Sequence, residues 1–164
     1  MNKSAPAEAL QVCTEATGCK KGVAGAGTGQ LSRADAIALG PAADLYVAES
    51  DNHRVQRFGL DGHFISTFGD GVNKTAVEET RSAEEDVCPA PGHPADVCQA
   101  GIAGSGPGQL GAGSYIRQLA VCGTDGRVFV GEGERIQVFS AGGVFQEAIA
   151  MPAGKSVAAL TMDP

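Results

Sequence analysis

The stretch KKGVAGAGTGQL at residues 20–31 recurs as QAGIAGSGPGQL at residues 99–110. A self-match of this length marks an internal repeat, and the match continues on both sides of it. Downstream, the matched pairs are Ile37 with Leu119, Tyr46 with Phe129, Glu49 with Glu132, Gln56 with Gln137, and Phe58 with Phe139. Upstream, Cys13 and Cys19 match Cys88 and Cys98. The chain is therefore organised as two copies of one unit, each preceded by a segment with two cysteines.

Short apolar runs fill the first copy and are separated by residues that favour turns. The runs are AIAL (36–39), LYVAE (45–49), RVQRF (54–58) and HFISTF (63–68). Gly, Pro, Asp and Asn between them predict tight connections, and hence four antiparallel strands. One such sheet cannot bury both of its faces alone. Repetition of a four-stranded unit is typical of propeller blades.

The sequence DLYVAESDNHRVQRFGLDG (44–62) resembles an NHL repeat, in which an Asp/Asn turn followed by His-Arg joins two strands. Asp51, Asn52, His53 and Arg54 carry that hallmark. The second copy, GRVFVGEGERIQVFSAGG (126–143), shortens the turn and lacks the Asn-His pair. The resemblance implies a β-propeller of the six-bladed, TolB-like type.

These observations predict an all-β chain that forms an incomplete β-propeller, with two four-stranded antiparallel blades plus the first strand of a third. LTMDP (160–164) matches IALGP (37–41), which suggests that third blade, with its first strand expected at residues 157–162. The expected segments are a pre-blade cysteine segment (1–21), an NHL-like blade (22–69), an acidic insert with a cysteine loop (70–100), a second NHL-like blade (101–149), and a linker with the first strand of a truncated blade (150–164).

Composition limits the classes of function. The 164 residues include 24 Gly and only 5% aromatic residues, which favours short strands and turns. A net charge of −7 opposes nucleic-acid binding, which depends on Lys and Arg, and favours basic or neutral partners. No apolar run is long enough to insert in a membrane. We also expect no cofactor.

The matched cysteines predict local disulfides, Cys13 with Cys19 and Cys88 with Cys98, and leave Cys122 unpaired as a small buried residue. Free thiols are one alternative. A metal site that includes His93 is the other, although the first copy has no histidine between its cysteines. Disulfides indicate an oxidising compartment, so we expect an extracellular or cell-surface protein.

His53 beside Arg54 is the most tempting catalytic pair, as a general base next to a cation. The turn motif favours a structural interpretation, in which the Asn and Asp side chains bond turn amides and Arg54 reaches a neighbouring strand or blade. No Ser-His-Asp order or phosphate-binding loop is present. AVEETRSAEED (76–86) is the best helical candidate, and it is strongly acidic.

The favoured function is a non-catalytic scaffold that binds protein or carbohydrate, as a fragment completed by missing blades or by self-association. The alternative is part of a metal-dependent lyase or hydrolase propeller. In such enzymes the first strands hold the metal, but here residues 36–39 and 118–121 contain no His or acid, and only Asp35 and Arg117 stand at their entrances. Strand alternation predicts that the cysteine loop, the acidic insert and residues 50–53 share one face.

Overall fold

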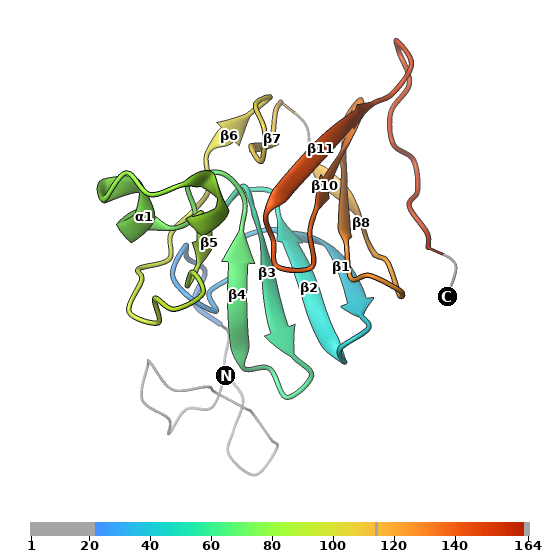
Figure 1. Cartoon of the computed structure of the whole chain (residues 1–164). Helices are drawn as coiled ribbons and strands as arrows, with labels where there is room; N and C mark the ends of the chain where they lie inside the picture. Colours follow the sequence, from blue (N-terminus) through green and yellow to red (C-terminus); the bar gives the residue numbers. More distant parts are fainter. Residues whose placement is uncertain (1–21, 114, 163–164) are drawn as a thin grey trace.

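The structure, a computed structural model, describes residues 22–113 and 115–162. In the first repeat unit (unit 1), four strands follow one another in the chain and in the sheet. They are β1 (Ala34–Gly40), β2 (Asp44–Glu49), β3 (Arg54–Gly59) and β4 (Phe64–Phe68). Each pairs antiparallel with the next, as the short runs and turn residues predicted. Figure 1 shows these strands side by side.

The second repeat unit (unit 2) forms a separate antiparallel sheet in the same order. Its strands are β8 (Ile116–Val121), β9 (Val128–Glu132), β10 (Arg135–Phe139) and β11 (Phe145–Ala150). Both units connect their last two strands through a glycine with positive φ, Gly62 (87°) and Gly143 (89°). Only glycine adopts this conformation readily, so the repeated Gly fixes the hairpin.

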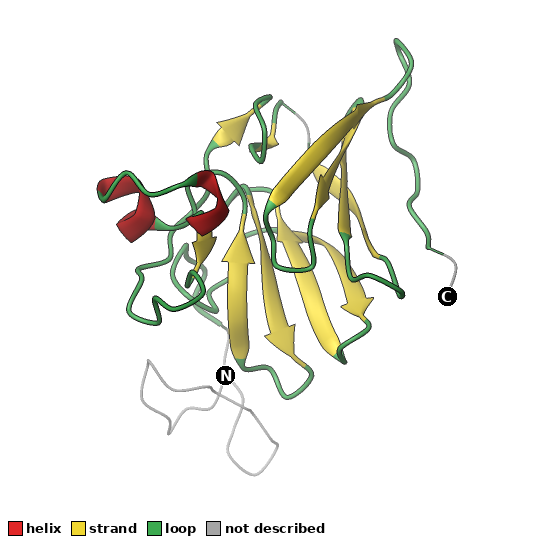
Figure 2. Ribbon diagram, viewed as in Figure 1, coloured by secondary structure: helices red, strands yellow, loops and turns green. Residues whose placement is uncertain are grey.

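The hydrophobic core lies between the two sheets, where strands β1 and β2 of unit 1 face β8 of unit 2. Tyr46, Ala48 and Phe68 from unit 1 meet Leu119 and Val130 from unit 2 in one buried cluster. Alternation along each strand sends every second side chain into this layer. Figure 2 shows that strands dominate the described chain, which confirms the expected all-β class with antiparallel sheets.

The acidic insert between the units is more structured than a surface loop. The expected helix over residues 76–86 forms in two short pieces, α1 (Lys74–Glu78) and a 3-10 turn at Ala83–Glu85. Asn73 caps α1 by accepting the N–H of Ala76, and the helix stops before Thr80, which has a φ of 56°. A left-handed residue cannot continue a right-handed helix.

A strand that the sequence did not predict follows the 3-10 turn. β5 (Val87–Cys88) pairs with β4 through Thr67 and Phe68, so the sheet of unit 1 has five strands. Its apolar Val87 is buried in the core between the units. The insert is thereby anchored to unit 1 at its outer edge.

The glycine-rich segment before unit 2 contains β6 (Ala103–Gly104) and β7 (Leu110–Gly111), which pair in parallel. In Figure 1 this segment lies at the top of the view, between the insert on the left and β11 of unit 2 on the right. Among the described residues, no helix is long and apolar enough to cross a membrane.

The expected strand at residues 157–162 is not formed: residues 151–162 contain no strand. The segment makes isolated hydrogen bonds instead, from Val157 N to Gly133 O and from Gln118 Nε2 to Ala158 O. A strand needs a partner strand to bond along its length, and none of the described residues supplies one here. This segment extends away from β11 in Figure 1.

Candidate functional site

A buried set of Glu, Arg and Gln holds the glycine-rich segment of unit 1 on its sheet. Arg54 and Glu49 form an ion pair at 2.8 Å, and both side chains are fully buried. Gln56 lies beside them and donates to Glu49 at 2.8 Å. We call these three residues the lock of unit 1, because they bond both to one another and to the backbone of residues 26–32.

The lock makes several hydrogen bonds to backbone groups of the glycine-rich segment where the chain turns. Arg54 donates to the carbonyls of Ala26, Gly27 and Gln30, while Glu49 accepts the N–H of Ser32. The segment follows this tight path because Gly25 leaves room for the Gln30 side chain, whose Oε1 would lie 2.1 Å from a Cβ at position 25. The charged side chains of the lock therefore hold the glycine-rich loop in place through hydrogen bonds.

Unit 2 repeats the lock with Glu132, Arg135 and Gln137. Arg135 donates to Glu132 at 2.6 Å and to the carbonyls of Gly104, Ser105 and Gln109. Gln137 donates to Gln109 O, as Gln56 does to Gln30 O. The sequence showed the Glu and Gln matches, but only the fold shows that they act with the arginines as one network.

The four turn residues predicted as a motif have different surroundings. Asn52 is buried and donates to Gly25 O and Glu49 Oε1, both at 2.8 Å. Asp51 is exposed and accepts from Ser32 Oγ at 3.4 Å. The structure thus places Arg54 in the lock, bonds Asn52 to the lock through Glu49, and leaves Asp51 exposed beside it.

His53 lies between the two units rather than in an open turn. Its Nδ1 is buried with no hydrogen-bond partner, and a Cβ at Gly111 of the next glycine-rich segment would lie 2.5 Å from it. The residue has a φ of 49°. Beside it, Gly101 N donates to Asn52 O at 2.8 Å. Among the described residues, His53 therefore has no nucleophile or acid partner of the kind a general base requires.

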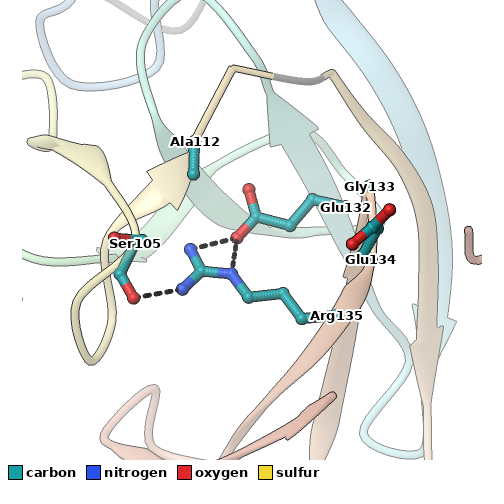
Figure 3. Close-up of a pocket in the computed structure, with 6 residues that line it drawn as sticks. All are labelled: Ser105, Ala112, Glu132, Gly133, Glu134 and Arg135. Carbon is teal, nitrogen blue, oxygen red and sulfur yellow. Dashed lines mark hydrogen bonds and ion pairs between the residues drawn. The ribbon is translucent and has the colours of Figure 1, made fainter. Parts of the chain in front are cut away.

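The shortened turn of unit 2 leaves an open depression of about 370 Å³ at its lock. The residues that line it are Ser105, Ala112, Glu132, Gly133, Glu134 and Arg135. In Figure 3, Glu132 and Arg135 extend from the strands toward Ser105. In unit 1, the Asn52 amide bonds Gly25 O. In unit 2, Arg135 bonds the matching Gly104 carbonyl instead, so the backbone stays satisfied.

A second pocket, of about 190 Å³, lies where the insert meets both units. One wall is apolar and comes from Phe139, Val144 and Phe145 of unit 2. The other side carries the acidic residues Asp70, Glu84 and Asp86. The rest of the lining comes from Gly69, Ala83, Pro107, Gly108 and Gly143. We call this the junction pocket.

The junction pocket is electrostatically negative. Within the described residues, none of its three carboxylates lies within ion-pair distance of a Lys, Arg or His. Burial raises the pKa of the Asp86 carboxyl, against the N–H groups of Gly71 and Asn73 that donate to it, and the nearby Asp70 charge also raises it. A cation in the pocket would relieve this cost.

The cysteine loop of the insert is closed by a disulfide between Cys88 and Cys98, as predicted. Cys13 and Cys19 lie outside the described residues. The Nε2 atom of His93 lies 3.6 Å from Oε2 of Glu85. In the described part of the chain, no three His, Cys, Asp or Glu side chains are placed to hold a metal ion. Cys122 is free and half-buried, with its Sγ 3.1 Å from Thr124 Oγ1.

The two polar residues at the entrances of the first strands do not form a site together. Asp35 pairs with Arg33 at 3.1 Å, and Arg33 stacks on the ring of Tyr115 at 3.5 Å. Arg117 lies farther out, 5.8 Å from the same ring. This cation–π contact joins the two units at the surface.

Comparison with family models and with curated proteins finds no match to this chain.

Proposed function

We propose that the chain is a non-catalytic binding scaffold of the NHL-repeat type, an incomplete β-propeller that binds a protein or carbohydrate partner. The two units share the same order of four antiparallel strands, and their sheets pack against each other around one core, which supports the blade interpretation. The locks of both units support the non-catalytic interpretation, because their charged groups are bonded to loop backbone. The junction pocket, in contrast, holds three acidic residues that have no ion-pair partner in the described part of the chain.

The junction pocket is the observation that carries the proposal. It combines an aromatic wall with carboxylates that have no ion-pair partner among the described residues, and it is built from three segments that the fold brings together. A lysine or arginine side chain matches both walls, because its alkyl stem packs on Phe139 and Phe145 while its charge meets the carboxylates. The overall charge of −7 attracts such a partner as well. A protein partner with a basic segment therefore fits better than a neutral carbohydrate.

We place the protein outside the cell or at its surface. The support is the Cys88–Cys98 disulfide, which persists in oxidising compartments. Peptide mapping without reduction, on protein from its native source, tests the placement. Alkylation of both cysteines would contradict it.

Titration calorimetry with a lysine-rich peptide and with a neutral oligosaccharide tests the proposed function. We expect the peptide to bind and Val144→Lys to abolish binding, because the new ammonium group would occupy the pocket. Glu84→Gln should weaken binding several-fold. Glu147→Gln is the matched control, since it makes the same change at an exposed position of β11 outside the pocket. Equal effects of the two Gln substitutions would reject the pocket as the site.

A further inference from the structure

Two apolar side chains of β1 are exposed although their repeat counterparts are buried. Ile37 and Leu39 are 64% and 67% exposed. Leu119 and Val121 hold the same register positions on the first strand of unit 2, and each is 8% exposed. The face of β1 that carries Ile37 and Leu39 is thus built like a buried face, but no described residue covers it.

Unit 2 shows what covers such a face. Leu119 and Val121 pack against unit 1, in a cluster with Tyr46 and Ala48 of β2 and with the small side chains of β1. The covering surface is therefore a sheet that presents alanines beside one aromatic ring. Small side chains let two sheets approach closely, and the ring fills the space between them.

The opposite face of unit 2 repeats this covering pattern except at Gln118, which stands where unit 1 has Ala36. Ala120, Phe129 and Gly131 occupy the registers of Ala38, Tyr46 and Ala48. We propose that the β1 face of one chain docks on this face of unit 2 in a second copy. The contact continues the existing interface between the units and is head-to-tail, so it builds rings or filaments rather than a two-fold dimer.

The chain's own C-terminal segment competes for the same face. Val157 is buried there, and a Cβ at Gly131 would lie 2.8 Å from its Cγ1. Leu160 reaches the same face, with its Cδ1 3.2 Å from that Cβ, and the hydrogen bonds of Val157 N and Ala158 O add to the hold. The residues around them, 152–156, 158 and 159, are exposed. Docking of a second copy displaces Val157. Loosening this residue should therefore favour assembly.

Light scattering coupled to size-exclusion chromatography, over a range of concentrations of the full chain, tests the inference. We expect the average mass to rise above the 16.5 kDa of one chain as concentration increases. Ile37→Lys should hold the mass at that of one chain, because it places a charge in the contact. Leu60→Lys is the matched control: Leu60 is 65% exposed but lies in the β3–β4 turn, away from this face.

Val157→Asp gives the second arm of the test. It should lower the concentration needed for assembly several-fold, and the double variant with Ile37→Lys should stay monomeric. Circular dichroism confirms that each variant is folded. Assembly that survives Ile37→Lys would point to strand-edge pairing and overturn the proposal. A monomer at every concentration for both the wild type and Val157→Asp would overturn it as well.

Discussion

At the scale of single residues, burial separates the roles of adjacent side chains in the turn motif. Arg54 is fully buried and makes an ion pair together with several bonds to carbonyls, whereas His53 makes no hydrogen bond through its buried Nδ1. The sequence raised a catalytic pair as one interpretation and favoured a structural role for the turn motif. The structure gives each residue a separate environment.

Arg54→Ala should lower the free energy of unfolding by about 3–5 kcal/mol, because it leaves Glu49 as a buried charge without its partner. His53→Ala should have a much smaller effect, since no hydrogen bond of Nδ1 is lost. Urea denaturation followed by circular dichroism measures both. If His53→Ala is the more damaging of the two, the role assigned to the lock is wrong.

The raised pKa of Asp86 predicts how peptide binding depends on pH. A cationic peptide favours the ionised carboxylate, so binding is strong above the raised pKa and weakens as the pH falls through it. The loss should therefore begin at a higher pH than for an ordinary aspartate. Calorimetry at constant ionic strength checks this, and an affinity that stays constant down to the ordinary aspartate pKa would contradict it.

At the scale of elements, the two glycine-rich segments have similar sequences, but the space around matching glycines differs between them. Gly101 and Gly22 are repeat counterparts. A Cβ at Gly101 would lie 2.3 Å from the backbone oxygen of His53, whereas a Cβ at Gly22 meets nothing within 4 Å. The second segment packs closely against the backbone of unit 1, and this close contact requires glycine at position 101.

Gly101→Ala should destabilise the fold by about 1–3 kcal/mol, because backbone must move to admit the methyl group. Gly22→Ala is the matched control and should change stability by less than about 0.5 kcal/mol. Thermal melts of the two variants give the comparison. Equal melting temperatures would show that the contact between Gly101 and the backbone of His53 is looser than described.

At the scale of the whole molecule, one core makes the two units depend on each other. Phe68 of β4 is 1% exposed, and its ring centroid lies 5.1 Å from that of Phe139 in unit 2 and 6.4 Å from that of Tyr46. The insert adds Val87 to the same cluster. Neither sheet has a complete core of its own.

Phe68→Ala should lower the free energy of unfolding by about 3–5 kcal/mol, because it opens a cavity in the shared core. The melting temperatures of both units should therefore fall together. Calorimetry should show a single transition for both the wild type and the variant. Leu60→Ala, an exposed leucine, serves as the control. Two separate transitions, only one of them shifted, would mean that the units fold independently.

The sequence by itself determined the elements: the short runs and turn glycines predicted the four strands of each unit, and the matched cysteines predicted the Cys88–Cys98 disulfide. These features follow from local conformation and spacing. Tertiary structure alone decided the rest. The lock joins residues far apart in the chain, the junction pocket needs three segments to meet, and β5 exists because the edge of β4 offers a partner. Residues 157–162 form no strand for the opposite reason, because strand formation depends on a neighbour that local sequence does not encode.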